Sequence, residues 1–132
     1  MPLPVTALYA ALLALLFLVL SLLVIRQRYR SRIALGGGER LLERAIRAQG
    51  NCAEYLPPVL LLLGLLEGLG AASAVLHGLG ACFLAGRILH AVGISREPEV
   101  LYWRSTGMAL TFGVLGIAAA LLLGLALRTL TA

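Results

Sequence analysis

The sequence predicts an all-α integral membrane protein, a four-helix up-and-down bundle, from its composition and from four apolar blocks. Hydrophobic residues make up 61% of the 132 residues and charged residues only 13%, and the mean hydropathy is +0.97. A soluble globule of this composition would lack the polar residues to cover its surface. The blocks approach the roughly 17–25 residues that a helix needs to cross a bilayer, and they lack the alternation typical of a transmembrane β-strand. The predicted spans are residues 5–25, 56–72, 74–93 and 106–127, within a single membrane domain covering residues 1–132.

The first block, residues 5–25, predicts a retained membrane helix and not a secretory signal. No basic residue precedes it, and arginines follow it where a cleavage site would carry small residues. Because arginine favours helix, we expect this helix to continue through residues 26–32, toward a turn at Gly36–Gly38. Residues 39–49 then form an amphipathic stretch that leads directly into the second span. The other polar connection, residues 95–99, is expected to precede the fourth helix.

The basic residues are distributed unevenly along the chain. All eleven are arginines, against six glutamates, for a formal net charge of +5. Seven arginines lie between Arg26 and Arg47, and the third connection adds Arg96 and Arg104, whereas the second connection carries no charge. Positively charged connections stay on the cytoplasmic side of a membrane. We therefore expect both basic connections to be cytoplasmic and both termini to lie outside, with Arg128 as the one exception to this charge distribution.

Several residues in the apolar blocks are predicted to have structural roles. Small residues that recur at every fourth position allow two helix backbones to approach closely in a membrane, within the bundle or between subunits. At the end away from the basic connections, Glu67 and His77 are expected to cap or solvate helix ends. The small residues with this spacing are Gly64 and Gly68, Ala81 and Ala85, and Gly116, Ala120 and Gly124.

A polar stripe marks the start of the second span. At about 100° per residue, an arc of about 100° contains the side chains of Arg44, Arg47, Asn51, Glu54, Tyr55 and Pro58. A carboxylate inside the hydrocarbon edge, as predicted for Glu54, is strongly destabilising unless it pairs with a cation or accepts several hydrogen bonds. The stripe is therefore predicted to face protein or a polar cavity.

Arginines are expected to provide the partner that Glu54 needs. Arg47 on the same helix is one candidate. Arg87 on the third helix, with His90 three residues later on the same face, is better placed because the third helix ends on the side where the second begins. These residues are therefore expected to meet in the cytoplasmic leaflet.

Several guanidinium groups, an amide and one glutamate suit a small ligand that carries carboxylates and an amine. Guanidinium binds carboxylate through two parallel hydrogen bonds, and a glutamate can accept an ammonium group. A glutathione-like molecule, with two carboxylates, one ammonium and two amides, has this set of groups. A nucleotide phosphate would suit the arginines equally, but Gly36–Gly38 lacks the Gly-Lys-Ser/Thr of a phosphate loop. No nucleic-acid partner is expected, because no folded soluble surface accompanies the arginines, and Cys52 and Cys82 have no metal-ligand spacing.

Two motifs carry a family resemblance, R-A-Q-x-N-x-x-E-Y-x-P at residues 47–57 and G-R-x-x-H at residues 86–90. With four spans and a long basic first connection, the chain resembles the MAPEG family, the membrane-associated proteins of eicosanoid and glutathione metabolism, and particularly its small bacterial members. The resemblance implies a homotrimer in a bacterial inner membrane, with glutathione as cosubstrate held between neighbouring subunits at the cytoplasmic end. The glutathione-binding positions that it implies are Arg26, Arg47, Gln49, Asn51, Glu54, Tyr55 and Arg87.

The resemblance also implies glutathione transferase or peroxidase chemistry on a small lipophilic electrophile. The guanidinium of Arg104 or Arg96 would favour the thiolate by lowering the pKa of the thiol, and His90 would assist as a hydrogen-bond donor or proton carrier. The sequence departs from the family pattern where some transferases have tyrosines on the third helix, because His90 and Ile94 occupy that region. The arginine that stabilises the thiolate in such enzymes has no unambiguous counterpart.

Two other interpretations remain open at this point. The arginine–glutamate network could be structural, in a non-catalytic membrane scaffold or anion-binding protein. A small four-helix transporter would need an ionisable residue near the middle of the membrane, whereas Glu54 and Arg87 lie toward one side, so this class is the least favoured.

Overall fold

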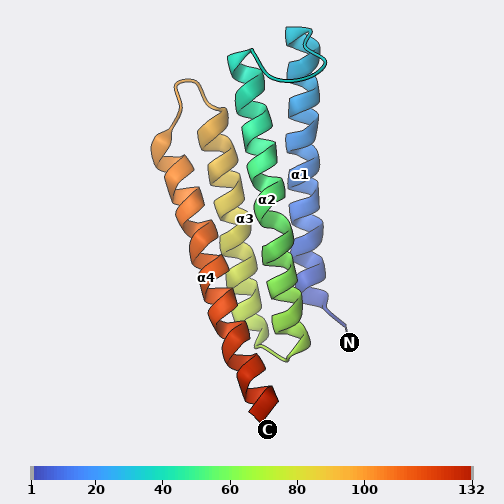
Figure 1. The fold of residues 1–132 in the computed structure, drawn as a ribbon, viewed down its shortest axis with the longest axis vertical. Helices are drawn as coiled ribbons and strands as arrows, with labels where there is room; N and C mark the ends of the chain where they lie inside the picture. The colour runs from blue at the N-terminus through green and yellow to red at the C-terminus, as the bar shows by residue number, and fades with distance from the viewer. Residues whose placement is uncertain (1, 132) are drawn as a thin grey trace.

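The computed structural model describes residues 2–131 and contains four helices in this part of the chain. They are α1 (Pro4–Ser31), α2 (Arg40–Gly68), α3 (Ser73–Ser95) and α4 (Leu101–Thr131). The helices run alternately up and down, so that the α1–α2 and α3–α4 connections lie at one end of the bundle and both termini lie at the other (Figure 1). The predicted four-helix up-and-down architecture is therefore confirmed.

Within residues 2–131, three helices are long and apolar enough to cross a membrane, namely α1, α3 and α4. The helix α2 does not meet this criterion, so three of the four predicted apolar spans are supported by length and composition. The reason is its composition: the first half of α2 carries the polar stripe, and Glu67 lies in its last turn. The helix α2 ends at Gly68, before the end of the predicted second span at residue 72.

The connection between α1 and α2 is the predicted turn. Gly36 and Gly38 have φ angles of 75° and 107°, in the left-handed region that favours glycine. Arg28 at the end of α1 donates to the backbone carbonyls of Ala34 and Gly36, both at 3.1 Å. The carboxylate of Glu39 then accepts from the first N–H groups of α2 and caps its N-terminus. The amphipathic stretch is therefore the beginning of α2 itself.

At the opposite end, Glu67 stabilises the start of α1. Its carboxylate oxygens accept from the backbone N–H groups of Val5 and Thr6 at 2.9 and 2.7 Å. These groups have no partner within their own helix, and a negative charge is favourable at a helix N-terminus. The capping role predicted for Glu67 is confirmed, while His77 receives a hydrogen bond from the Tyr9 hydroxyl on its backbone carbonyl, at 3.0 Å.

Three glycines allow α3 and α4 to touch through their backbones. A Cβ atom at Gly107 would lie 2.5 Å from the carbonyl oxygen of Gly86, and one at Gly93 would lie 2.6 Å from the backbone nitrogen of Arg104. Close helix contacts were predicted at the small residues spaced by four. At three of these glycines, the chain makes no such contact with itself. A Cβ atom at Gly68, Gly116 or Gly124 would meet nothing within 4 Å.

This contact predicts that Gly107→Ala destabilises the protein. The added methyl group would meet backbone atoms that cannot rotate away, and overpacking of this kind costs about 1–3 kcal/mol. Thermal unfolding of the purified protein in detergent should show a clearly lowered midpoint. Gly116→Ala is the matched control, because its methyl group enters open space. Equal midpoints for the two variants would contradict the proposed backbone contact.

Candidate functional site

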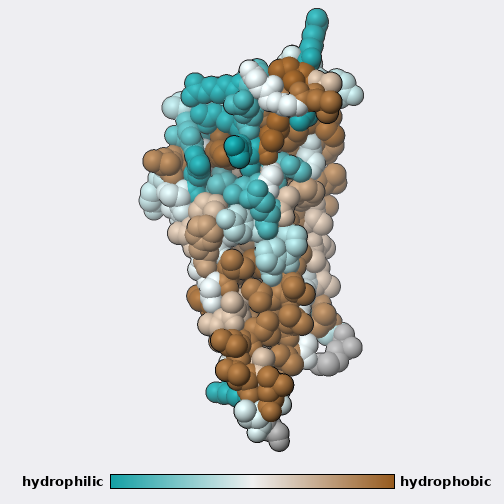
Figure 2. All heavy atoms as spheres, viewed as in Figure 1, coloured by the Kyte–Doolittle hydropathy of each residue, from teal (hydrophilic) through white to brown (hydrophobic). Residues whose placement is uncertain are grey.

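A large polar hollow lies at the end of the bundle that carries both polar connections. Figure 2 shows hydrophilic residues gathered at this end, whereas apolar residues dominate the rest of the visible face. The hollow has a volume of about 1030 Å³. Pockets for small-molecule ligands measure roughly 300–1,000 Å³, so an entire small ligand fits inside. The charged residues that line it are Arg28, Arg40, Glu43, Arg44, Arg47, Glu54, Glu99 and Arg104.

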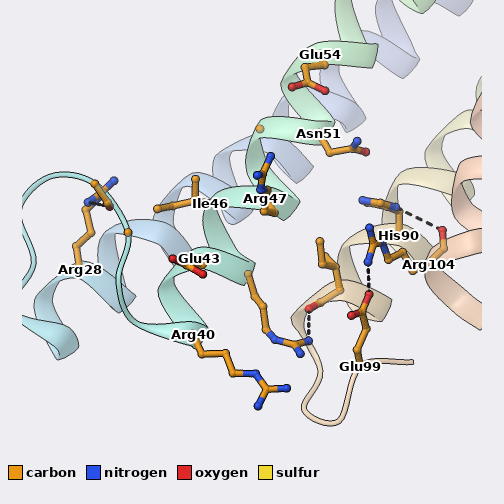
Figure 3. Close-up of a pocket in the computed structure, with 15 residues that line it drawn as sticks. Arg28, Arg40, Glu43, Ile46, Arg47, Asn51, Glu54, His90, Glu99 and Arg104 are labelled. Carbon is orange, nitrogen blue, oxygen red and sulfur yellow. Dashed lines mark hydrogen bonds and ion pairs between the residues drawn. The ribbon is translucent and has the colours of Figure 1, made fainter. Parts of the chain in front are cut away.

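The polar stripe of α2 forms one wall of this hollow. Figure 3 shows Arg40, Glu43, Arg47, Asn51 and Glu54 along successive turns of α2, and all five line the hollow. Their spacing of three or four residues places them on one face of the helix. The expectation that the stripe faces a polar cavity is therefore confirmed in part. The hollow is lined by four of the predicted members, Arg44, Arg47, Asn51 and Glu54, but not by Tyr55 or Pro58.

The facing wall comes from α3, the α3–α4 connection and the start of α4. His90 is buried, and its Nδ1 atom lies 3.4 Å from the backbone carbonyl oxygen of Arg104. The Arg104 side chain donates to the carboxylate of Glu99, with Nη1 and Oε1 2.5 Å apart. This hydrogen bond lowers the pKa of Glu99 below its ordinary value. The hollow therefore brings together His90 and Arg104, which were both predicted as candidate catalytic residues.

Glu99 is a site residue that the sequence reasoning missed. The sequence could have indicated this pairing, because Glu99 lies in the short connection before α4 and Arg104 follows it by five residues in the first turn of α4. That connection was read only as a turn, and neither of its two glutamates was considered as a partner for an arginine. The structure distinguishes them, because Glu99 lines the hollow whereas Glu97 pairs with Arg40 at 3.0 Å.

Most of the charged groups in the hollow are already engaged by the protein. Arg28 and Arg44 donate to backbone carbonyls, and Glu43 accepts from the backbone N–H of Gly38 at 3.2 Å. In the described part of the chain, Arg47 and Glu54 have neither an ion pair nor a side-chain hydrogen bond. Both side chains are exposed to the hollow side of α2.

The predicted pairing of Glu54 with an arginine is therefore wrong for this chain. No ion pair joins Glu54 to Arg47 or to Arg87 among residues 2–131. The physical reason is that Glu54 opens onto the hollow and is exposed, so it does not lie among buried groups that would demand a cation. An exposed carboxylate in a polar hollow remains available to a ligand.

Arg87 lies behind the stripe and not in the hollow. It is only 1% exposed, and its Nη1 atom donates to the side-chain oxygen of Asn51 at 2.5 Å. Its Nη2 atom donates to the hydroxyl of Thr111 on α4 at 2.6 Å, and its guanidinium lies over the ring of Tyr55, 5.4 Å from the centroid. Arg87 thus joins three helices and fixes the orientation of Asn51, whose amide nitrogen is left as a donor.

Four other predicted residues do not line the hollow of a single chain. Arg26 is exposed on α1, and Gln49 is half-buried on a different face of α2. Tyr55 packs edge-to-face against Phe112 on α4. Arg96 is exposed, with its guanidinium 4.5 Å from the ring centroid of Trp103. Of the ten predicted site residues, the hollow therefore unites Arg47, Asn51, Glu54, His90 and Arg104.

The arrangement suits anion binding. Among residues 2–131 no group of three or more His, Cys, Asp or Glu side chains could hold a metal ion. Cys52 is buried and Cys82 is exposed, and both are free thiols. The guanidinium groups can hold carboxylates or a thiolate, Glu54 can hold an ammonium group, and Asn51 can donate to a carbonyl.

Comparison with known proteins identifies the family. The sequence model of the MAPEG family matches residues 6–124, which include parts of all four helices and both polar connections. The chain is 40% identical over 109 residues to the inner membrane protein YecN of Escherichia coli strain K12, with 82% of each chain covered. The protein of the same name from Escherichia coli O6:H1 is similar to the same extent. The chain therefore belongs to the MAPEG family, as its two motifs predicted.

Proposed function

We propose that the protein binds glutathione in the polar hollow and uses it as cosubstrate of a glutathione transferase or peroxidase acting on lipophilic electrophiles. One observation carries the proposal. Arg47 and Glu54 are charges of opposite sign without a protein partner in the described chain, and both line the hollow from the same face of α2. A ligand with a carboxylate and an ammonium group would neutralise both at once.

The distance along α2 fits a short peptide. Arg47 and Glu54 are seven residues apart, which corresponds to about 10 Å of helix at about 1.5 Å per residue. An extended chain of three residues reaches about 10 Å at roughly 3.3–3.6 Å per residue. In this pose the ammonium group lies at Glu54 and the far carboxylate at Arg47. Asn51, one turn beyond Arg47 and held by Arg87, donates its amide N–H to a peptide carbonyl.

Arg104 and His90 are the groups that would act on the thiol. Arg104 lines the hollow whereas Arg96 lies over Trp103, so the structure favours Arg104 as the guanidinium that stabilises the thiolate. Because the Arg104 carbonyl can only accept, the nearby Nδ1 of His90 carries the hydrogen when it bonds there, and a neutral ring then has a free lone pair on Nε2.

The buried Nε2 of His90 has no hydrogen-bond partner in the described structure. We assign it the thiol proton. The sulfur lone pair then forms the bond to the electrophilic carbon, and the leaving group departs with its electron pair.

The assembly and location form part of the same proposal. A homotrimer with glutathione between neighbouring subunits, as the family resemblance implies, would cover the exposed side of the hollow. We place the protein in a bacterial inner membrane, because the Escherichia coli relative is named an inner membrane protein. The arginine-rich end faces the cytoplasm and both termini face outside. In that assembly α2 is the fourth span, shielded by the three apolar helices.

One observation favours a non-catalytic alternative. The hydrogen bonds from Arg87 to Asn51 and Thr111 form without a ligand, although the buried Nε atom of Arg87 has no partner among residues 2–131, so these bonds are able to link the helices by themselves. A membrane scaffold or anion-binding protein would need no more than this. The two functions differ in whether Arg47 and Glu54 bind glutathione and whether the thiol reacts.

Glutathione titration by calorimetry tests the binding site. In purified protein, Arg47→Ala and Glu54→Gln should each weaken binding by about 10- to 100-fold, because each removes a charge-assisted hydrogen bond. Arg128→Ala, at the other end of the bundle, is the matched control and should bind as the wild type does. Unchanged affinity in both site variants would contradict the proposed pose, and a wild type that does not bind would support the structural alternative.

A conjugation assay with an aryl chloride electrophile tests turnover. Arg104→Leu should shift the pH profile of kcat/KM to higher pH, because loss of the cation raises the pKa of the thiol. His90→Gln should lower kcat by about 100-fold or more, the usual contribution of general acid–base catalysis, with little change in glutathione affinity. If the wild type binds glutathione but shows neither conjugation nor peroxidase turnover, the enzymatic function is excluded and the protein is a non-catalytic glutathione-binding protein.

A further inference from the structure

The ion pair between Glu99 and Arg104 places a carboxylate of the protein on an arginine of the hollow. The Glu99 Oε1 and Arg104 Nη1 atoms are 2.5 Å apart, and both residues line the hollow (Figure 3). Their side chains keep 29% and 44% of their surface exposed. The pair is therefore accessible from the side on which a ligand would enter.

The α3–α4 connection does not need this pair to keep its shape. Arg44 on α2 donates to the backbone carbonyls of Ile94 and Arg96 at 3.1 and 2.8 Å. The Val100 N–H donates to the Gly93 carbonyl at 3.2 Å. The guanidinium of Arg96 also packs on the ring of Trp103 in the same segment. An additional, partly exposed ion pair contributes little to such a connection.

The backbone of Arg104 is fixed while its side chain is free to exchange partners. The backbone nitrogen of Arg104 packs against Gly93, where an added Cβ atom would lie 2.6 Å from that nitrogen. The backbone carbonyl oxygen of Arg104 faces His90. Glu99 lies in the connection before α4 begins at Leu101, so its carboxylate can turn away by side-chain rotation alone. Exchange at Arg104 therefore requires no movement of a helix.

We propose that Glu99 is the resident counter-ion of the site, a carboxylate that occupies Arg104 when the hollow is empty and yields it to an anionic group of the ligand. The identification of that ligand as glutathione rests on the proposed function, whereas the exchange itself applies to any small anion. Glu99 thereby acts as a specificity-determining residue. A simple anion must displace Glu99 unaided, whereas a zwitterion that also contacts Arg47 and Glu54 gains interactions that offset the displacement.

The charges around Glu99 support this exchange at neutral pH. The groups that act on its carboxyl are Arg104, Arg44 and His90, from α4, α2 and α3. The hydrogen bond from Arg104 lowers the pKa of Glu99, so Glu99 stays ionised near neutrality and is protonated only in acid. The ion pair is therefore present above this lowered pKa and is lost as the pH falls through it, which leaves Arg104 free for another anion.

Titration of the full-length purified protein with glutathione and with inorganic sulfate tests the inference. Glu99→Gln should bind both anions about two- to fivefold more tightly than the wild type, the effect expected from removing one partly exposed competing ion pair. Glu97→Gln is the comparison variant, because it removes a carboxylate from the same connection and frees the more exposed Arg40 but not Arg104, so it should strengthen binding less than Glu99→Gln. Glu99→Asp keeps the charge on a shorter side chain and serves as a second variant if Glu99→Gln unfolds. It should give intermediate affinities.

The outcomes separate this inference from the proposed function. Tighter sulfate binding by Glu99→Gln without any glutathione binding would support the counter-ion role and refute the glutathione site. Glutathione binding of equal strength in the wild type and in Glu99→Gln would overturn the counter-ion role and leave the glutathione site intact. Weaker binding of either anion by Glu99→Gln, or no sulfate binding by this variant, would also overturn it.

Discussion

The buried guanidinium of Arg87 is the interaction on which the geometry of the site depends. It extends from α3 to Asn51 on α2 and to Thr111 on α4, so it sets how the two walls of the hollow face each other. A buried charged group that loses a hydrogen-bond partner is strongly destabilised, so Asn51 and Thr111 hold the guanidinium in place. The backbone contact between α3 and α4 at Gly107 and Gly93 then fixes Arg104 relative to His90. Residues that only pack or link the helices, such as Arg87 and Gly107, therefore hold the residues that line the hollow.

Much of the fold was predictable because hydropathy and charge are local properties of the sequence. Four helices, the turn at Gly36–Gly38 and the capping role of Glu67 all follow from residue types and spacing. The bounds were less predictable, since α2 begins at Arg40 and α4 at Leu101, well before the apolar blocks within them. An apolar block marks the part of a helix that suits lipid, whereas hydrogen bonding extends the helix beyond it. The same distinction explains why α2 is a helix of the bundle without meeting the criterion for an apolar span.

The site was predictable in part. The stripe from Arg47 to Glu54 follows from helical periodicity, which the sequence shows directly. The partner of each arginine cannot be derived from periodicity. The chain has eleven arginines and six glutamates, which allow many pairings, and only the tertiary structure selects among them. For this reason Glu54 was expected to be paired but has no ion pair among residues 2–131, whereas Glu99 was overlooked and is paired with Arg104. The small residues spaced by four also did not predict the close contact between α3 and α4 at Gly93 and Gly107. The presence of a glycine does not decide where two backbones meet, because only the glycines on the facing surfaces of the two helices allow it.

The central claim is that the free charges of α2 hold a zwitterionic peptide in the polar hollow. The most direct test is an experimental structure of the protein purified in detergent and saturated with glutathione. The claim predicts density in the hollow, with the ammonium group against Glu54, a carboxylate against Arg47 and the sulfur near Arg104. A saturated sample that shows an empty hollow, or glutathione bound elsewhere on the bundle, would contradict it.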